Sequence, residues 1–263
     1  MKAYLAILSS HYRMLLQYRA AAIAGVGTQL FFGFVRVMIF DAFYRSSTAP
    51  QPMTIAEVVT YIWLGQAFLL LTILDADKEV TAMIRTGAVA YELTRPLDLY
   101  SLWFTRALSG RAAPLSMRAI PIFVLAGAFF GLQAPSSVTA FTLFLVSLVG
   151  ALLLGASIIT LITISMLWTI SGEGVNRLAA PMIYFLSGLL IPLPLFPVWA
   201  QQIISVLPFR GLIDTPFRIY MGNLAGPDAL LALVHQYSWG VVFILAGRFA
   251  LSRGLNRLVV QGG

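Results

Sequence analysis

The chain has 263 residues, of which 59 % are hydrophobic and only 10 % are charged. Soluble domains carry roughly 25 % charged residues, so the composition indicates an integral membrane protein and leaves no room for an independent soluble core. The net charge of +7 is typical of the basic loops that orient membrane proteins and does not indicate nucleic-acid binding. The absence of cysteine excludes disulfides, thiolate metal sites and cysteine nucleophiles.

Residues 1–19 predict an amphipathic helix on the cytoplasmic membrane surface. Its apolar residues recur at helical spacing and are Leu5, Leu8, Tyr12, Leu15 and Leu16. Ser9, Arg13 and Gln17 fall on another face of the same helix. The stretch is too long and too mixed for a signal peptide. The alternative is a disordered basic leader that only fixes orientation.

Membrane spans form the body of the chain, and each spanning helix needs about 20 mostly apolar residues. The candidates are Ala20–Phe43, Thr54–Leu74, Ala112–Leu132, Val138–Trp168, Leu178–Leu190 and Leu230–Leu251. The fourth is longer than one crossing requires, so it is expected to tilt or extend beyond the bilayer. The sequence therefore predicts an all-α, polytopic membrane protein with six transmembrane helices and both termini on one side.

The basic residues of the connecting segments fix the orientation. With the N-terminus inside, the inner segments contain Lys2, Arg13, Arg19, Lys78, Arg85, Arg95, Arg106, Arg177, Arg248, Arg253 and Arg257. The outer segments contain only Arg45, Arg210 and Arg218. This bias predicts that both termini are cytoplasmic.

Three arginines lie within or beside the spans, where ionisable residues often mark function. Arg36 is deep in the first span, and we expect it to snorkel to the outer interface near Asp41. The alternative is an anchor for an anionic lipid or substrate. Arg111 and Arg118 are seven residues apart and share one helix face. They either snorkel inward or form a basic stripe along a substrate path.

The inner connection of residues 76–111 is the longest one. Val80, Met83 and Ile84 share one face of a short amphipathic helix, and Gly87 is a plausible stop. A second short element follows, with apolar residues at Val89, Leu93 and Leu97. Such a mixture of charged and apolar residues suits the docking of a cytosolic partner; the alternative is a helix lying on lipid head groups.

Enzymatic chemistry finds no support in the sequence. The run Asp75–Glu79 has a lysine in its middle and no histidine nearby, so it predicts a solvated helix end and not a metal site. His11 and His235 have neither metal-ligand nor triad spacing. No G-x-x-x-x-G-K-[ST] segment is present, so the chain lacks a Walker-type phosphate cradle, and any ATP hydrolysis must occur in another polypeptide.

The acidic residues keep to the edges of the spans, as Asp41, Glu57, Asp75, Asp77 and Glu79 show. An ion-coupled carrier usually needs a buried carboxylate, so this reading is weakened. It remains an alternative, as do a channel, a membrane-embedded lipid-modifying enzyme and a structural assembly factor.

Prolines interrupt the chain after the fifth span. Because proline removes an amide donor and clashes with the preceding turn, the segment cannot continue as a straight helix, yet it stays apolar. Broken backbone at membrane depth is tolerated where protein or a water-filled cavity covers it. This predicts a re-entrant outer segment at residues 192–216 and favours a transport domain over a simple anchor. The residues concerned are Gly188, Pro192, Pro194, Pro197 and Trp199.

The order of these features resembles the permease subunits of ABC-2 type exporters, in a bacterial subfamily encoded beside separate ATPases. The resemblance rests on the six-span order, the amphipathic start and three short segments over nearly the whole chain, which would make residues 1–263 one transmembrane domain. The segments are Gly87 with Leu93-Thr94-Arg95-Pro96-Leu97, Leu186-Ser187-Gly188 with Pro192 and Pro197, and the ending Arg257-Leu258-Val259-Val260-Gln261-Gly262-Gly263.

The resemblance implies a multi-pass protein of the bacterial inner membrane that pairs with a second copy or a similar permease. Two cytosolic ATPase subunits, which bind the ATP and Mg²⁺, would dock beneath. The 192–216 segment would close the exit, with the glycine, prolines and tryptophan named above as an outer gate. The coupling residues would be Lys78, Glu79, Arg85, Glu92, Arg95 and Pro96. The cargo, its contact residues, and the choice between homodimer and heterodimer stay open.

Overall fold

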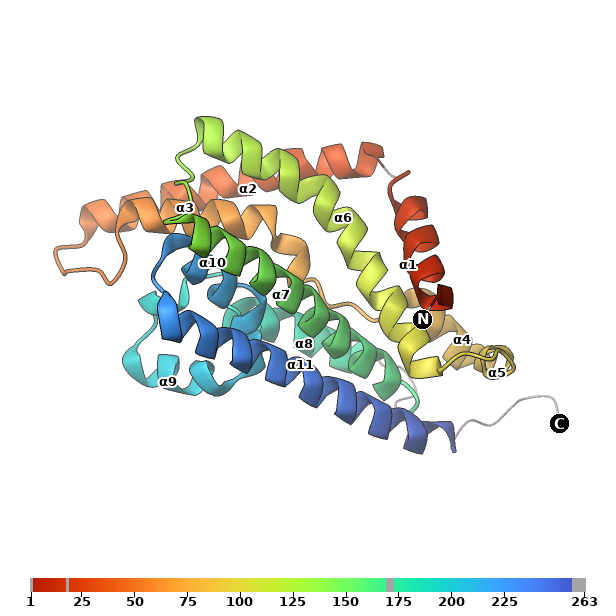
Figure 1. Cartoon of the computed structure of the whole chain (residues 1–263). Coiled ribbons are helices and arrows are strands. Elements are labelled where there is room, and N and C mark those ends of the chain that lie inside the picture. The colour runs from red at the N-terminus through yellow and green to blue at the C-terminus, as the bar shows by residue number, and fades with distance from the viewer. Residues whose placement is uncertain (1, 18, 169–172, 257–263) are drawn as a thin grey trace.

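The computed structural model describes residues 2–17, 19–168 and 173–256. Within these residues the chain consists of helices joined by loops and has no strand (Figure 1). The ending 257–263, part of the family resemblance, lies outside the described residues. The α-helices are α1 Lys2–Leu15, α2 Arg19–Ser46, α3 Ile55–Ala67, α4 Lys78–Thr86, α5 Val89–Leu93, α6 Leu99–Phe129, α7 Val138–Ser165, α8 Glu173–Leu186, α9 Val198–Val206, α10 Asp214–Met221 and α11 Gly226–Leu255. Three 3₁₀ turns are η1 Leu69–Leu71, η2 Leu193–Leu195 and η3 Pro208–Leu212.

Four helices, α2, α6, α7 and α11, are long and apolar enough to cross a bilayer. Helices α3 and α8 overlap the other two predicted spans but have only 13 and 14 residues, about 20 Å each at 1.5 Å per residue. The polytopic, all-helical class is therefore confirmed, while the count of six crossings and the orientation of the termini stay predictions.

Helix α6 begins well before the span predicted from hydropathy. Asp98 is its N-cap and accepts a hydrogen bond from the Ser101 backbone N–H at 2.9 Å, so the helix starts at Leu99 and not near Ala112. Its first turns are amphipathic, so their hydropathy is too low for them to be recognised as part of a span. The capping residue marks where the helix begins. The last part of the 76–111 connection is therefore continuous with α6, the helix that contains the third predicted span.

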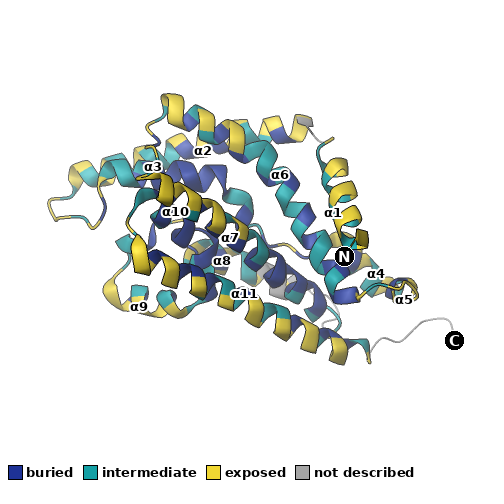
Figure 2. Cartoon of the chain, in the orientation of Figure 1, coloured by how far each residue is buried: buried dark blue, intermediate teal, exposed yellow. Residues whose placement is uncertain are grey.

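Helix α7 is the centre of the molecule. Of its most apolar stretch 61 % is buried inside the protein, against 11 % for α2 and 28 % each for α6 and α11. Helix α11 lies along α7 (Figure 1), and small residues at the buried positions let the helices approach closely. Figure 2 shows the contrast between this buried interior and the exposed sides of α2 and α11.

The exposed side of α2 is strongly apolar. Ile23, Phe31, Met38 and Ile39 are each more than 60 % exposed. A surface of this kind is expected against lipid tails, because a water-exposed patch of this size would be an association site. The outer helices of the bundle therefore present apolar faces to the bilayer.

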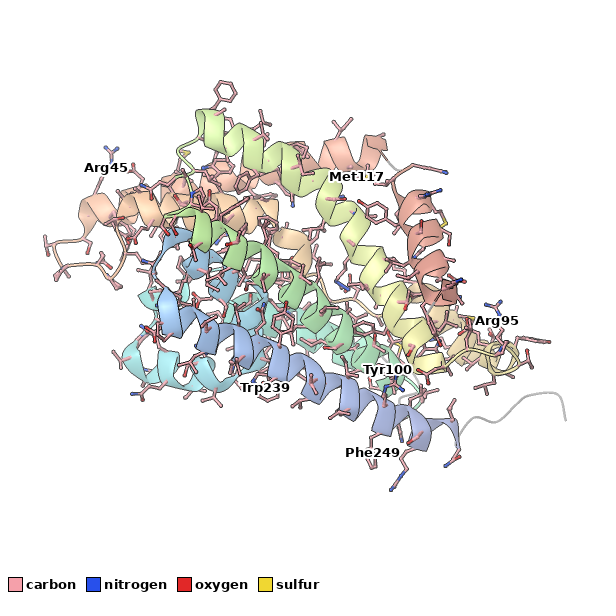
Figure 3. The ribbon with its side chains drawn as sticks, in the orientation of Figure 1. Arg45, Arg95, Tyr100, Met117, Trp239 and Phe249 are labelled. Atoms are coloured by element: carbon pink, nitrogen blue, oxygen red, sulfur yellow. The ribbon has the colours of Figure 1, made fainter. Side chains whose placement is uncertain are left out.

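The two ends of the bundle differ in character (Figure 1). Helices α4 and α5, the start of α6 and the end of α11 lie together at one end, which we call the coupling end. Helix α9 and the loop between α2 and α3 lie at the opposite end, which we call the gate end. In Figure 3, Arg95 marks the coupling end and Arg45 the gate end.

Candidate functional site

The coupling end is built around α4, whose boundaries follow local sequence signals. Asp77 is the N-cap and accepts hydrogen bonds from the backbone N–H groups of Glu79 and Val80. Gly87 ends the helix in the left-handed conformation with φ 73°, which glycine adopts without strain. The predicted short helix with its stop at Gly87 is confirmed, and Val80 on its apolar face is fully buried.

Helix α5 is fixed to α6 by a buried polar cluster around Glu92. The Glu92 side chain accepts a hydrogen bond from Trp103 Nε1 at 2.8 Å, and the Arg106 guanidinium lies 3.0 Å from its other oxygen. Glu92 is only 4 % exposed, so it faces α6 and is hidden from a cytosolic partner. We name Glu92, Trp103 and Arg106 the α5 clamp.

The structure thus divides the predicted coupling residues into two groups. Glu92 belongs to the α5 clamp, and the sequence analysis missed its partners Trp103 and Arg106, whose i, i+3 spacing on one helix face was the available signal. The other predicted coupling residues are exposed at the coupling end, namely Lys78, Glu79, Arg85, Arg95 and Pro96.

A second small core joins this segment to the ends of three long helices. Val80 of α4 and Val89 of α5 pack with Trp103 of α6, Ile164 of α7 and Leu251 of α11. Packed interiors transmit displacement because they are close-packed and barely compressible. A force applied to α4 and α5 would therefore reach α6, α7 and α11 together.

Asp98 ties α1, α6 and α11 at the same end. Its carboxylate lies 3.2 Å from the Arg248 guanidinium, and its backbone N–H donates to Tyr4 Oη at 2.8 Å. Partial burial by itself would raise the pKa of Asp98, but the hydrogen bonds from Ser101 and the Arg248 charge outweigh it and hold this pKa below its usual value. Arg248 also lies over the Tyr100 ring at 5.0 Å.

Helix α1 packs along α6 through its predicted apolar face. Leu8, Tyr12 and Leu15 are partly covered, whereas Leu5, predicted on the same face, is 61 % exposed. Ser9 and Arg13 are exposed as expected. The helix is fastened by two side-chain hydrogen bonds, His11 to Ser109 at 2.6 Å and Tyr12 to Ser116 at 2.8 Å. The predicted amphipathic helix is confirmed, and its position on the membrane surface stays a prediction.

Arg36 does not reach Asp41, so that prediction is wrong. Its guanidinium donates hydrogen bonds to the backbone carbonyls of Leu189 and Leu190, the latter at 2.8 Å, whereas Asp41 pairs with Arg45 at 2.8 Å. The break after α8 leaves carbonyls without helical donors, and Arg36 satisfies them. Its partners are more than 150 positions away, so no local pattern could identify them.

Arg111 and Arg118 also donate to backbone carbonyls. Arg111 bonds to Ile73 between η1 and α4, and Arg118 reaches Ala21 of α2 at 3.5 Å. Arg111 and His11 are among the residues lining a cavity of about 230 Å³ between α1, α6 and the segment that joins η1 to α4. Arg118 is not among the residues that line this cavity, and the basic stripe along a substrate path stays a prediction.

At the gate end, α8 stops at Leu186 and the chain breaks as the prolines predict. Gly188 has φ 86°, Pro192 precedes η2 and Pro197 is the N-cap of α9. Pro192 is buried, whereas Trp199 on α9 is 68 % exposed. The predicted break is confirmed, and the gating role of its residues stays a prediction.

Gln236 of α11 links η3 and α7 through hydrogen bonds of its side chain. Its side-chain amide donates to the carbonyls of Ser147 on α7 at 2.9 Å and Gly211 in η3 at 2.6 Å, and its oxygen accepts from Ser147 Oγ at 3.0 Å. Gln236 is 1 % exposed. Polar side chains of this kind hold membrane helices together, but a lone glutamine in an apolar run gave no signal of its partners.

Replacing Gly188 with alanine is expected to loosen the gate end. The left-handed backbone costs a non-glycine residue about 1–2 kcal/mol, and an added Cβ would lie 2.6 Å from Tyr61 Oη and 2.9 Å from Leu193 Cγ. The thermal unfolding midpoint in detergent should fall. Gly27→Ala is the control, because a Cβ there meets nothing within 4 Å; equal midpoints for the two variants would contradict the prediction.

These features together define a polytopic helical membrane protein with two short packed helices at one end and a broken helix at the other. The family model described as ABC-2 family transporter protein matches residues 30–262. The match covers most of the chain, so this protein belongs to the ABC-2 transporter family. No curated protein matches the chain.

Proposed function

We propose that this chain is the permease subunit of an ATP-driven exporter in the bacterial inner membrane, acting with a separate cytosolic ATPase dimer. Membership of the ABC-2 family supports an ABC permease. ATP and Mg²⁺ bind in the ATPase partner, and a second copy of this chain or a similar permease completes the translocation path.

The observation that carries the proposal is the position of α4 and α5. They rest on the ends of α6, α7 and α11 through a common core, while their outer side carries basic residues and the exposed Tyr91 and Leu93, 77 % and 50 % exposed. An ATPase that grips this outer side can move three long helices at once. Closure of the ATPase dimer would thereby shift the permease toward its outward-open form.

Reversing the charge of Arg85 and Arg95 together is expected to weaken ATPase binding by at least tenfold. The introduced glutamates would face the acidic groups that we expect opposite the two arginines, and like charges across an interface cost several kcal/mol. Both side chains are exposed at the coupling end. Co-purification of the tagged permease with its ATPase from native membranes measures the effect. Arg253→Glu is the matched control, since Arg253 is also exposed at the coupling end but belongs to the last turn of α11 and not to α4 or α5.

Full recovery of the ATPase with the Arg85→Glu/Arg95→Glu variant would contradict this docking site. The wider proposal is tested in liposomes, where the permease alone should neither hydrolyse ATP nor move cargo uphill. Uphill transport by the permease alone under a proton gradient would instead favour an ion-coupled carrier.

A further inference from the structure

A polar cavity of about 260 Å³ lies beneath α9 at the gate end. Gln201, Gln202 and Ser205 of α9 line one side of it, and Arg210, Asp214 and Arg218 line another. A water molecule takes about 30 Å³ of liquid, so the cavity has room for a phosphate-sized group together with water. These six side chains are not among the predicted coupling or outer-gate residues, although most of them lie in the predicted re-entrant segment 192–216 and the outer-gate residue Pro194 also lines the cavity.

The charges of the cavity do not balance. Asp214 is 2 % exposed and is the only acidic one among the described residues that line the cavity, whereas two arginines line it. The closest Arg218–Asp214 approach is 3.8 Å, longer than a hydrogen bond. Tyr61 Oη lies 3.4 Å from the other Asp214 oxygen. One positive charge is therefore left over among the lining residues.

The two guanidinium groups also have unused donors. The Nε atoms of Arg210 and Arg218 are buried and have no hydrogen-bond partner within the described chain. Buried donors are normally satisfied by protein or by a bound group. Guanidinium groups match the paired oxygens of phosphate and carboxylate in geometry and charge, so two arginines lining one cavity favour an anion with several oxygens.

An apolar groove of about 400 Å³ lies on the other side of α9 and is lined by Phe185, Phe196, Trp199 and Ile203 among others. The short segment 193–198 contributes residues to both hollows: Pro194 lines the cavity, and Leu195 and Phe196 line the groove. A ligand with a charged head and an apolar body can place its head in the cavity and its body in the groove, on the two sides of this segment.

We propose that the cavity beneath α9 binds the phosphate group of an anionic amphiphile, whose apolar part lies in the adjoining groove. Arg210 and Arg218 are the phosphate contacts, and Gln202 lies at the rim. The inference goes beyond the proposed export function and does not require the ATPase partner, so it is tested on the permease alone.

The test places the purified full chain in nanodiscs of phosphatidylcholine with a minor fraction of phosphatidylglycerol. Native mass spectrometry then measures how much phosphatidylglycerol stays bound after mild release. Arg210→Gln/Arg218→Gln should lower retention roughly tenfold or more, since each hydrogen bond to a charged group contributes substantially to affinity. Arg45→Gln, which removes an exposed arginine at the same end, should leave retention unchanged.

Because loss of both arginines leaves Asp214 without its cationic neighbours, a second variant guards against misfolding. Gln202 is exposed, so Gln202→Glu should fold and should repel the anion, with a similar fall in retention. Equal retention in wild type and Gln202→Glu would overturn the proposal. Binding of soluble glycerol phosphate or inorganic phosphate without retention of phosphatidylglycerol would overturn the amphiphile assignment.

Discussion

Replacing Glu92 with alanine is expected to detach α5 from the bundle and to abolish ATP-driven transport. The change leaves the buried Arg106 with only the exposed Glu79 carboxylate, 4.0 Å away, and leaves Trp103 Nε1 without its acceptor. Removing one partner of a buried ion pair typically costs about 3–5 kcal/mol because the other charge stays desolvated. Hydrogen exchange of the α4–α5 backbone should accelerate strongly, and the thermal unfolding midpoint should fall.

Glu79→Ala is the matched control for the α5 clamp. Glu79 lies 4.0 Å from the same arginine, but its side chain is 71 % exposed, and exposed pairs contribute only about 0–1 kcal/mol. A double variant, Glu92→Leu/Arg106→Met, should recover much of the lost stability, because an apolar replacement of a buried pair is often neutral. Equal exchange rates for Glu92→Ala and Glu79→Ala would show that the clamp does not hold α5.

Measurements of transport and of ATPase binding distinguish the two roles of the coupling end, which are capture of the ATPase and transmission of its movement. Glu92→Ala should reduce transport more than it reduces the initial capture of the ATPase, since the exposed basic residues remain. Charge reversal at Arg85 and Arg95 should act on capture first. A clamp that only stabilised the fold would lower both in proportion.

Local signals predicted the elements whose boundaries are set by nearby residues. Asp77 and Gly87 define the ends of α4. Gly188, with its positive φ, follows the end of α8, and the prolines from Pro192 on prevent a straight continuation, because capping and proline geometry act over a few residues. The face of α1 that packs on α6 followed from its 3.6-residue spacing. Hydropathy alone placed the start of α6 too late, since Asp98 caps an amphipathic first turn.

The contacts that the sequence could not supply are those between distant segments. Arg36 meets the Leu189 and Leu190 carbonyls, and Gln236 meets Gly211, only because the fold brings these backbones together. Asp214 was overlooked because it lies outside every predicted span, although it is fully enclosed by the gate end. Glu92 looked like a docking residue because its charge, but not its buried partner, is visible in the sequence.

These buried polar groups have a common role at the two ends of the bundle. Carbonyls outside regular helices in a membrane protein must find hydrogen-bond donors within the protein, since lipid tails cannot donate hydrogen bonds as water does. Arg36 provides such donors at the break after α8, as Gln236 does for η3. At the gate end these long-range hydrogen bonds therefore satisfy backbone carbonyls that no helix satisfies.

Replacing Arg36 with methionine is expected to open the break after α8. Methionine keeps an apolar stem in place but leaves the Leu189 and Leu190 carbonyls without their donor, at about 1–3 kcal/mol for each unsatisfied group. Because the chain contains no cysteine, Leu190→Cys, at a site 52 % exposed, gives a single labelling site. Its reaction with a membrane-impermeant maleimide should be several-fold faster when Arg36→Met is also present.

Arg45→Met in the same Leu190→Cys background is the control, because Arg45 forms only an exposed pair with Asp41, which is expected to contribute little. Arg36→Lys should lie between wild type and Arg36→Met, since an ammonium keeps the charge but lacks the planar fork that reaches two carbonyls. If the labelling rates of all these variants agree, the break is held by packing alone. A labelling rate that rises in the order Arg36, Arg36→Lys, Arg36→Met would show that the guanidinium group holds this end of the permease closed.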